Sequence, residues 1–435
     1  MLHQRQKLHF YMALISAIVF AYTLFFKTEF ISLKNWNFTA CQISKNWSLH
    51  TNDCLFTREK SIVLSYPVNP ERKLLKCFYE QNTPLMTNLN PDAAWLPPES
   101  CRVWNKPLKI PDIGWDSYQV WYARALIIFE NSKTKGLLHS LTDWDSFHIL
   151  ENKDYLRYPW LVSQVFAFIL WLFNSSHPLI LQVFQVLMML SCALLFYKLR
   201  PKNDKYLWLC FALAPISARF LFYIYADLWV LGSILFLWWT LEHPRLGRWI
   251  IAPLILASCW LKAEAYVQIL FFLCTWVWLN KKVLSKNISI ILIAFSSLLV
   301  GALSYWQWAS SFPISENQTS LLERIVDPLT WIHRIPQISR YFLDVYFRPA
   351  FWGTLVVYFL YLLWKVKNQK HYLIATIPYF ILIVLIPTAF LGFPDGTYRE
   401  VVLTGANRAL WQLLPLMYLL MQSFLKALPQ KNYKQ

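Results

Sequence analysis

Apolar runs of roughly 17 to 22 residues recur along this chain of 435 residues and constrain its fold more than any other feature. Hydrophobic residues make up 57% of the sequence and charged residues only 15%, too few to keep such runs soluble. We therefore expect an all-α polytopic membrane protein with about 10 or 11 transmembrane helices. A large first extracytoplasmic loop with juxtamembrane helices should accompany them.

The net charge of +17 raises the question of a nucleic-acid partner. The Lys and Arg residues fall mainly in short connections and tails, which is the positive-inside distribution of a membrane protein. The composition therefore indicates membrane lipids as partners, and no nucleic acid.

The first apolar run, 9–26, follows Arg5 and Lys7 as in a signal peptide, but it lacks a small-residue cleavage site. We expect an uncleaved anchor with a cytoplasmic amino terminus. The resulting division is an anchor over 1–27, an extracytoplasmic loop over 28–157, a multi-helix transmembrane domain over 158–425 with outer loops at 310–349 and 392–405, and a cytoplasmic tail over 426–435.

Further apolar segments are expected at 158–173, 178–197, 207–222, 228–241, 249–262, 264–280, 288–309, 350–366, 372–391 and 406–425. Two full crossings over 158–197 would put the basic connection 198–205 outside. One of the first two segments should therefore be short, re-entrant or continuous with its neighbour.

Four of the eight cysteines lie in the first large loop, which is expected to be non-cytoplasmic. Four thiols in one polar extracytoplasmic loop favour two disulfides over a zinc site, with the pairing open. These residues are Cys41, Cys54, Cys77 and Cys101.

The segment GWDSYQVWYARAL places Asp116 at the start of an amphipathic helix that continues through Ile127. Asp116 is either a helix N-cap, with Gln119 completing a capping box, or a general base made reactive by partial desolvation beside Trp115 and Trp121. Asp112 is the weaker candidate for the same role.

Asp227 stands where a later span re-emerges, and a carboxylate so close to hydrocarbon needs a partner or a task. Arg219, two turns earlier, is one candidate partner.

Lys262 and Glu264 either neutralise each other in a tight outer turn, or Lys262 contacts a phosphate.

Arg399 and Arg408 flank the last span and either snorkel to the interface or hold a lipid phosphate with paired hydrogen bonds. His333, beside an arginine, is the one histidine of interest. With only nine glycines and no Gly-rich phosphate loop, a nucleotide-binding fold is disfavoured.

Several short motifs occur in a characteristic order from about residue 112: GWDSYQVWYARAL, DYLRYPWLVSQVFAFIL, YADLWVLGSILFLWW, LKAEAY and NRALWQLLPL. Together they resemble the membrane glycosyltransferases of the GT-C superfamily, of the mannosyltransferase or arabinosyltransferase kind. The resemblance implies a polyprenyl-phosphate-linked sugar as donor substrate, and an acidic residue of the first outer loop as the catalytic base.

By position, the resemblance assigns the base to Asp116, the start of the following helix to Tyr158, and a second outer-face acid to Asp227. No cofactor is certain, but if a divalent metal takes part, Asp116 and Asp227 are its expected ligands. The acceptor is a glycan, a lipid or a protein at the periplasmic or lumenal face. We expect the bacterial inner membrane, with the site facing the periplasm.

Two other functions fit a chain of this composition. A transporter or a flippase for lipid-linked saccharides would show internal repeats and polar residues near the bilayer midplane, whereas these charges cluster at one face. A non-catalytic scaffold would bind a partner through the cysteine-bearing loop and would tolerate Asn at Asp116 and Asp227.

Overall fold

The computed structural model describes part of the chain. The described residues are 2–26, 30–32, 38–42, 60–64, 102–103, 109–111, 120–142, 158–175, 177–202, 204–311, scattered positions between 328 and 348, 352–389 and 405–428. The helices are α1 (Leu2–Phe26), α2 (Tyr122–Lys135), α3 (Leu137–Thr142), α5 (Leu161–Leu172), α6 (Pro178–Lys198), α7 (Leu207–Ala212), α8 (Pro215–Phe220), α9 (Asp227–Glu242), α10 (Pro244–Cys259), α11 (Ala265–Leu279), α12 (Lys281–Ser310), α15 (Leu355–Lys365), α16 (Lys370–Ala389), α18 (Asn407–Trp411) and α19 (Leu414–Ala427).

Proline marks the start of several of these helices. It occupies the first turn of α6, α8, α10 and α19, where its missing N–H has no intrahelical partner to lose. At α6 the preceding His177 also accepts a hydrogen bond at Nδ1 from the backbone N–H of Leu179, at 3.1 Å. The boundaries of these helices therefore follow from local sequence.

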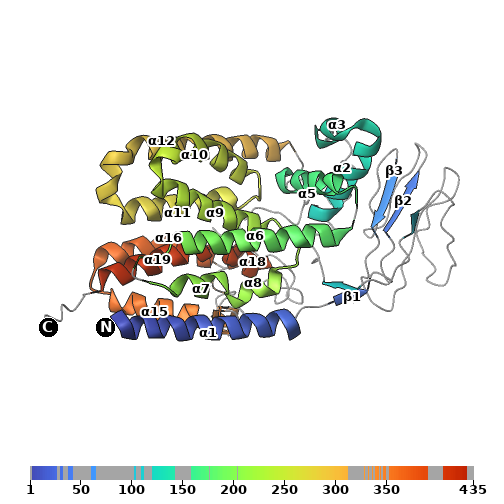
Figure 1. Cartoon of the computed structure of the whole chain (residues 1–435). Coiled ribbons are helices and arrows are strands. Elements are labelled where there is room, and N and C mark those ends of the chain that lie inside the picture. Colours follow the sequence, from blue (N-terminus) through green and yellow to red (C-terminus); the bar gives the residue numbers. More distant parts are fainter. Residues whose placement is uncertain are drawn as a thin grey trace.

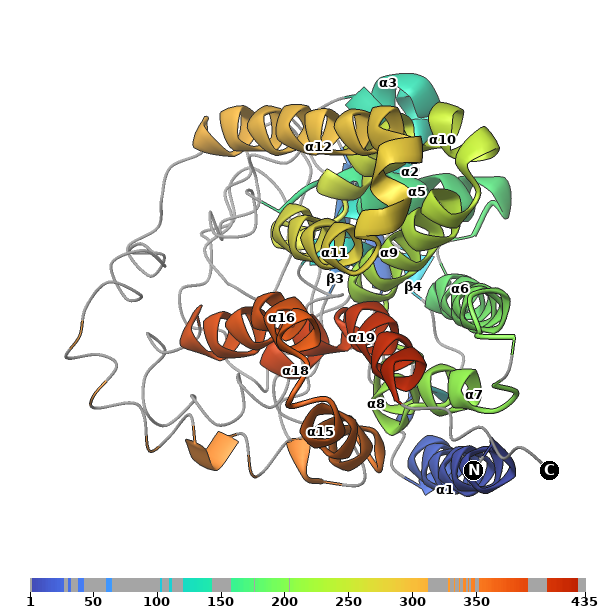
Figure 2. The same ribbon diagram turned by 90° about the vertical axis from the view of Figure 1, so that its left-hand side faces the viewer.

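The long helices run roughly along one direction and form a bundle (Figure 1). α1 begins and α19 ends at the same end of this bundle, and α2, α3 and α5 lie at the other end. Figure 2, which looks nearly along the helices, shows α9 among α6, α11 and α19, all of which it contacts. α9 is thus a central element.

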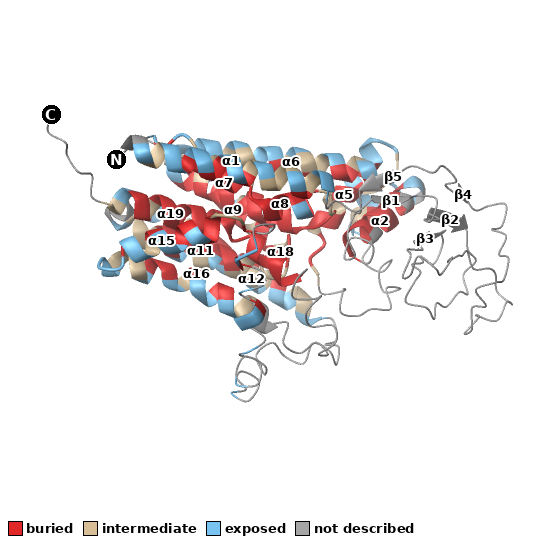
Figure 3. Cartoon of the chain, turned by 90° about the horizontal axis from the view of Figure 1, so that it is seen from below, coloured by how far each residue is buried: buried red, intermediate tan, exposed pale blue. Residues whose placement is uncertain are grey.

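Burial divides the helices into inner and outer ones (Figure 3). α9 and α19 are buried nearly all round, whereas α1, α6 and α12 each expose one face. The exposed face of α6 carries Leu187, Leu190 and Leu194, at helical spacing. Because this outward face is apolar, the bundle has the surface of an α-helical membrane protein.

Three of the described helices are long and apolar enough to cross a membrane: Gln4–Phe26, Pro178–Lys198 and Ile288–Ser310. Shorter apolar helices lie at Leu161–Leu172, Ala265–Leu279, Leu355–Lys365 and Lys370–Ile386, and the apolar stretch Leu207–Phe220 comprises α7 and α8. These positions agree with the apolar segments expected from the sequence.

The two helices within 158–197 differ in length. α5 has 12 residues, and at a rise of 1.5 Å per residue it spans about 18 Å, less than a hydrocarbon core of about 30 Å. α6, with 21 residues, is long enough. The first segment is therefore the short one.

The expected segment 207–222 is not one continuous helix. It is divided into α7 and α8 at Leu213 and Ala214, directly before Pro215. Proline cannot donate the next intrahelical hydrogen bond, and it disfavours helical geometry in the residue before it. Ala214 has ψ 130°, which is outside the helical range.

Five short strands amend the all-α expectation in the first loop. β1 (Phe30–Ser32) pairs antiparallel with β5 (Lys109–Pro111), and β2 (Phe38–Gln42) lies between β3 (Lys60–Leu64) and β4 (Arg102–Val103). Cys41 belongs to β2, opposite Ser61. Cys54, Cys77 and Cys101 lie outside the described residues, so the two disulfides stay a prediction.

Candidate functional site

Charged side chains from three separate parts of the chain meet at the end of the bundle away from the start of α1. Asp227 is the first residue of α9, Lys262 and Glu264 lie in the connection between α10 and α11, and Arg408 is in α18. Asp227 is fully buried, and Lys262 and Arg408 are nearly so. We call these four residues the Asp227 cluster.

Lys262 is the cation that pairs with Asp227. Its Nζ lies 2.9 Å from Oδ1 of Asp227, and it also forms an ion pair with Glu264. Asp227 gains further stabilisation from its place at the positive end of the α9 dipole. The ion pair between Lys262 and Glu264 is the one that the sequence suggested for a tight outer turn. The partner of Asp227 is Lys262 and not Arg219, the candidate from the sequence.

An amide completes the environment of this carboxylate. Gln412 donates from Nε2 to Oδ1 of Asp227, so that this one oxygen accepts from two side chains. Oδ2 is buried and accepts no hydrogen bond from the described residues. A carboxylate held this closely by an ammonium is a weak base, which fits positioning of Lys262 better than proton abstraction.

The ammonium of Lys262 stays charged in this environment. Burial lowers the pKa of Lys262 and Arg408 opposes a second positive charge, but the carboxylates of Asp227 and Glu264 outweigh both and raise the pKa above its ordinary value. The two cations of the cluster balance its two carboxylates. An incoming anion would thus meet an ammonium and a guanidinium that are already fixed in place.

Arg408 lies over an aromatic ring. Its guanidinium carbon lies 4.1 Å from the centre of the Tyr225 ring, which is a cation–π contact. The backbone carbonyl of Tyr225 in turn accepts from Gln185 Nε2 at 3.0 Å. Nearby in α18, the indole N–H of Trp411 donates to Ser217 Oγ at 2.9 Å. These contacts join α18 to α8 and to the α8–α9 connection, which α6 holds in turn.

Tyr158 connects the cluster to the helix that follows the Asp116 segment. Its phenol contributes to the electrostatic environment of Lys262, and its ring meets the edge of Trp121 at 5.7 Å between centroids. Its carbonyl accepts from Nη1 of Arg124 at 2.8 Å. Arg124, buried in α2, also lies over the ring of Trp160 at 4.7 Å. The start of α2 is therefore anchored beside the cluster.

Other residues singled out by the sequence are not placed. Asp112, Asp116, Arg399 and His333 lie outside the described residues. The described part of the helix expected from Asp116 begins at Tyr122 and extends to Lys135, past Ile127. The general base, the second arginine and the histidine therefore stay predictions.

A divalent metal at Asp227 would have to compete with the cations already there. No three His, Cys, Asp or Glu side chains gather as a metal site among the described residues. At Asp227 itself, Lys262 and Arg408 supply positive charge that would repel a metal ion. A metal at Asp227 would therefore have to displace Lys262, and the metal site expected at Asp116 and Asp227 stays a prediction because Asp116 lies outside the described residues.

The sequence did not single out Gln412, Tyr225 or Gln185, which complete the site. Uncharged side chains give no charge signal, and aromatics are common throughout this chain. One signal was present for the glutamines, because an amide inside an apolar segment needs a partner. Gln185 and Gln412 both meet that condition.

No family model matches this chain, and neither the curated proteins nor the solved structures contain a match.

Proposed function

We propose that this chain is an integral-membrane glycosyltransferase that moves a sugar from a polyprenyl-phosphate-linked donor to an acceptor at the outer membrane face. The main supporting observation is that two buried cations, Lys262 and Arg408, lie together at one end of an apolar bundle. A fixed ammonium and guanidinium at that depth suit a phosphate carried on a lipid. The same end holds α2, which follows Asp116.

In this proposal the acceptor hydroxyl oxygen attacks the anomeric carbon of the sugar, with inversion. The bond between that carbon and the phosphate oxygen breaks, and the polyprenyl phosphate or diphosphate leaves with the electron pair. Asp116 takes the proton of the hydroxyl as general base. Lys262 and Arg408 offset the charge that grows on the leaving phosphate, and Asp227 keeps Lys262 in position.

The distribution of buried charges supports a transferase over an ion-coupled transporter. Among the described residues, the buried charged or histidine side chains lie in connections or within about two turns of a helix end: His9, Arg124, Asp204, Asp227, Lys262 and Arg408. Transporters of this size place such groups near the bilayer midplane, in discontinuous helices.

The test is transfer of labelled sugar from a panel of polyprenyl-phosphate sugars in membranes that carry the wild-type chain or a variant at matched expression. Asp116→Asn should lower transfer about a hundredfold or more, because a general base contributes roughly that factor. Arg408→Gln should also lower it, whereas Arg245→Gln, at an exposed position, is the control.

The outcomes separate the parts of the proposal. Wild-type transfer with an unchanged Asp116→Asn variant would remove Asp116 as the base but keep the enzyme. Absence of transfer with every donor would overturn the glycosyltransferase and favour the transporter.

A further inference from the structure

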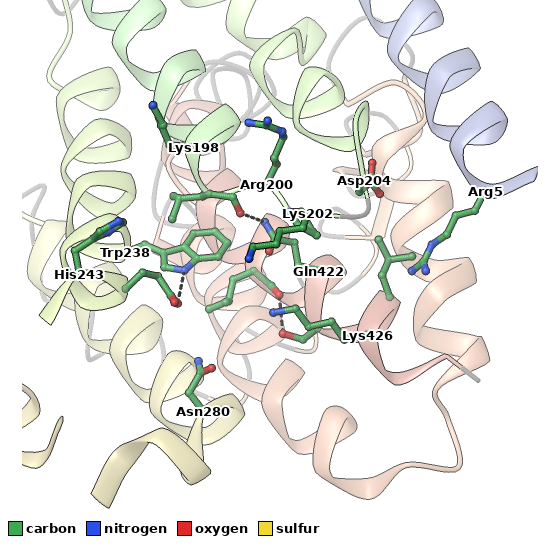
Figure 4. A pocket seen from close by; sticks show the side chains of 16 residues that line it. Arg5, Lys198, Arg200, Lys202, Asp204, Trp238, His243, Asn280, Gln422 and Lys426 are labelled. Atoms are coloured by element: carbon green, nitrogen blue, oxygen red, sulfur yellow. Dashed lines mark hydrogen bonds between the residues drawn. The ribbon is translucent and has the colours of Figure 1, made fainter. Parts of the chain in front are cut away.

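A second polar site lies at the opposite end of the bundle from the Asp227 cluster. A cavity of about 490 Å³ opens where α6, α9 and α19 end, beside the start of α1 (Figure 4). α9 carries Asp227 at one end and Glu242, a wall residue of the cavity, at the other. The 16 residues of that helix separate the two sites by about 22 Å.

The walls of this cavity are strongly basic. Five cationic side chains line it: Arg5, Lys198, Arg200, Lys202 and Lys426. They come from α1, from the end of α6 and the connection that follows it, and from α19, so the cavity gathers them from segments far apart in sequence. We call this site the basic cavity.

The two carboxylates in the walls are already engaged. Asp204 Oδ2 lies 2.6 Å from His9 Nδ1, and Oδ1 accepts from the backbone N–H groups of Tyr206 and Leu207. Glu242 Oε1 accepts from the indole N–H groups of Trp238 and Trp276, at 3.3 and 3.2 Å. Neither carboxylate forms an ion pair with a lysine or arginine of the cavity among the described residues.

Arg5 has donors that nothing in the described structure satisfies. Its Nε and Nη2 atoms are buried and have no hydrogen-bond acceptor among the described residues, although the side chain also bonds to Tyr358. In Figure 4 the guanidinium reaches from α1 toward the cavity. Buried donors of a charged group call for an acceptor, and because these two atoms are closed to solvent, an anion in the cavity would satisfy them once the Arg5 side chain turns toward it.

A hydrogen bond between two of the helices that line the cavity holds its walls together. Gln422 donates from Nε2 to the carbonyl of Leu199 at 2.9 Å and so joins α19 to the end of α6. In Figure 4 Lys202 and Lys426 extend into the middle of the space near Gln422. The ammonium groups of Lys202 and Lys426 and the guanidinium of Arg5 therefore line the same cavity.

We propose that the basic cavity binds a phosphate group, carried either by an anionic membrane lipid or by a soluble phosphate compound. Phosphate oxygens accept the paired donors of arginine and the point charge of lysine. The volume matches a headgroup or a small ester, and basic pockets between helix ends are a typical site for lipid phosphate. The positive-inside bias explains exposed lysines at this end but not the buried nitrogens of Arg5.

The test uses the purified full chain in nanodiscs. In one arm, nanodiscs of phosphatidylcholine are equilibrated with radiolabelled inorganic phosphate, and the Kd is measured. In the other arm, the nanodiscs also contain phosphatidylglycerol, and native mass spectrometry after mild detergent release counts the phosphatidylglycerol that each chain retains. The variants are Arg5→Gln and Lys426→Gln. Arg245→Gln and Lys370→Gln, exposed cations outside the cavity, are the controls.

Each cavity variant should weaken phosphate binding or lipid retention about tenfold, as expected for the loss of one charge-assisted hydrogen bond, while the controls stay within about twofold. A loss confined to the inorganic phosphate arm identifies a soluble ligand, and a loss confined to the lipid arm identifies a lipid headgroup. Binding in neither arm, or equal losses in cavity variants and controls, would overturn the proposal. Lys426→Gln keeps the test decisive if Arg5→Gln fails to fold.

Discussion

Lys262 Nζ lies 2.9 Å from Asp227 Oδ1, across 35 positions of sequence, and the same ammonium pairs with Glu264. One buried cation thus joins the start of α9 to the connection between α10 and α11. Because Asp227 is fully buried, its charge depends on that partner.

Removal of the cation should be strongly destabilising. Lys262→Met leaves the buried carboxylate of Asp227 without its ammonium partner and beside the half-buried Glu264, and loss of one member of a buried pair costs about 3–5 kcal/mol. Thermal unfolding in detergent, followed by tryptophan fluorescence, should show a large drop in the midpoint. Lys370→Met at an exposed position is the control.

The same experiment contains its own cross-check. Adding Asp227→Asn to Lys262→Met should restore part of the lost stability, because the unpaired carboxylate charge is gone and the two sites are coupled. Strictly additive losses would show that the pair contributes no interaction energy.

Asp204 should give part of the acid sensitivity of the protein. Burial raises the pKa of Asp204, but the hydrogen bond and charge of His9 and the N–H groups of Leu207 and Tyr206 outweigh it and lower the pKa below its ordinary value of 3.8. A depressed folded pKa stabilises the protein above the unfolded value, and that contribution is lost as pH falls through the folded pKa.

The measurement is the unfolding midpoint as a function of pH below about 5, where carboxylates begin to take up protons. Asp204→Asn should be less stable than the wild type near neutral pH and should lose less stability on acidification. Parallel curves for the two chains would contradict this assignment.

Gly301 permits the close packing of α12 on α10. A Cβ at this position would lie 2.8 Å from Cys259 Sγ and 3.1 Å from its Cβ. Gly301→Ala should therefore cost about 1–3 kcal/mol through overpacking. Combining it with Cys259→Ala, which removes the Sγ atom, should recover part of that loss in the same unfolding assay, with Cys259→Ala alone as the reference.

The positions of the apolar helices could be predicted from the sequence, because the length of an apolar segment and the placement of charges at its ends are local properties. The basic connections at Lys198–Lys205, Arg245 and Lys365–Lys370 do lie at helix ends, as the positive-inside pattern predicts. The break at Pro215 was also predictable, since proline and the residue before it resist a continuous helix. The strands of residues 30–111 were missed because they are only two to five residues long.

The partners within the site could not be read from the sequence in the same way. Arg219, two turns before Asp227, was the nearby candidate partner, yet Arg219 is exposed and Lys262 forms the ion pair. That choice depends on how α9 packs against the α10–α11 connection, which is a tertiary property. Gln412 approaches Asp227 across 185 positions for the same reason.

The central claim is that Lys262 and Arg408 hold the phosphate of a lipid-linked donor. The most direct test is the Kd of a short-chain polyprenyl phosphate, the product of the proposed reaction, for the purified chain and its variants. Arg408→Gln should weaken binding about tenfold or more, and Arg408→Lys should weaken it less. Arg245→Gln, exposed and outside both sites, should bind as the wild type does. An unchanged Kd for Arg408→Gln would contradict the account.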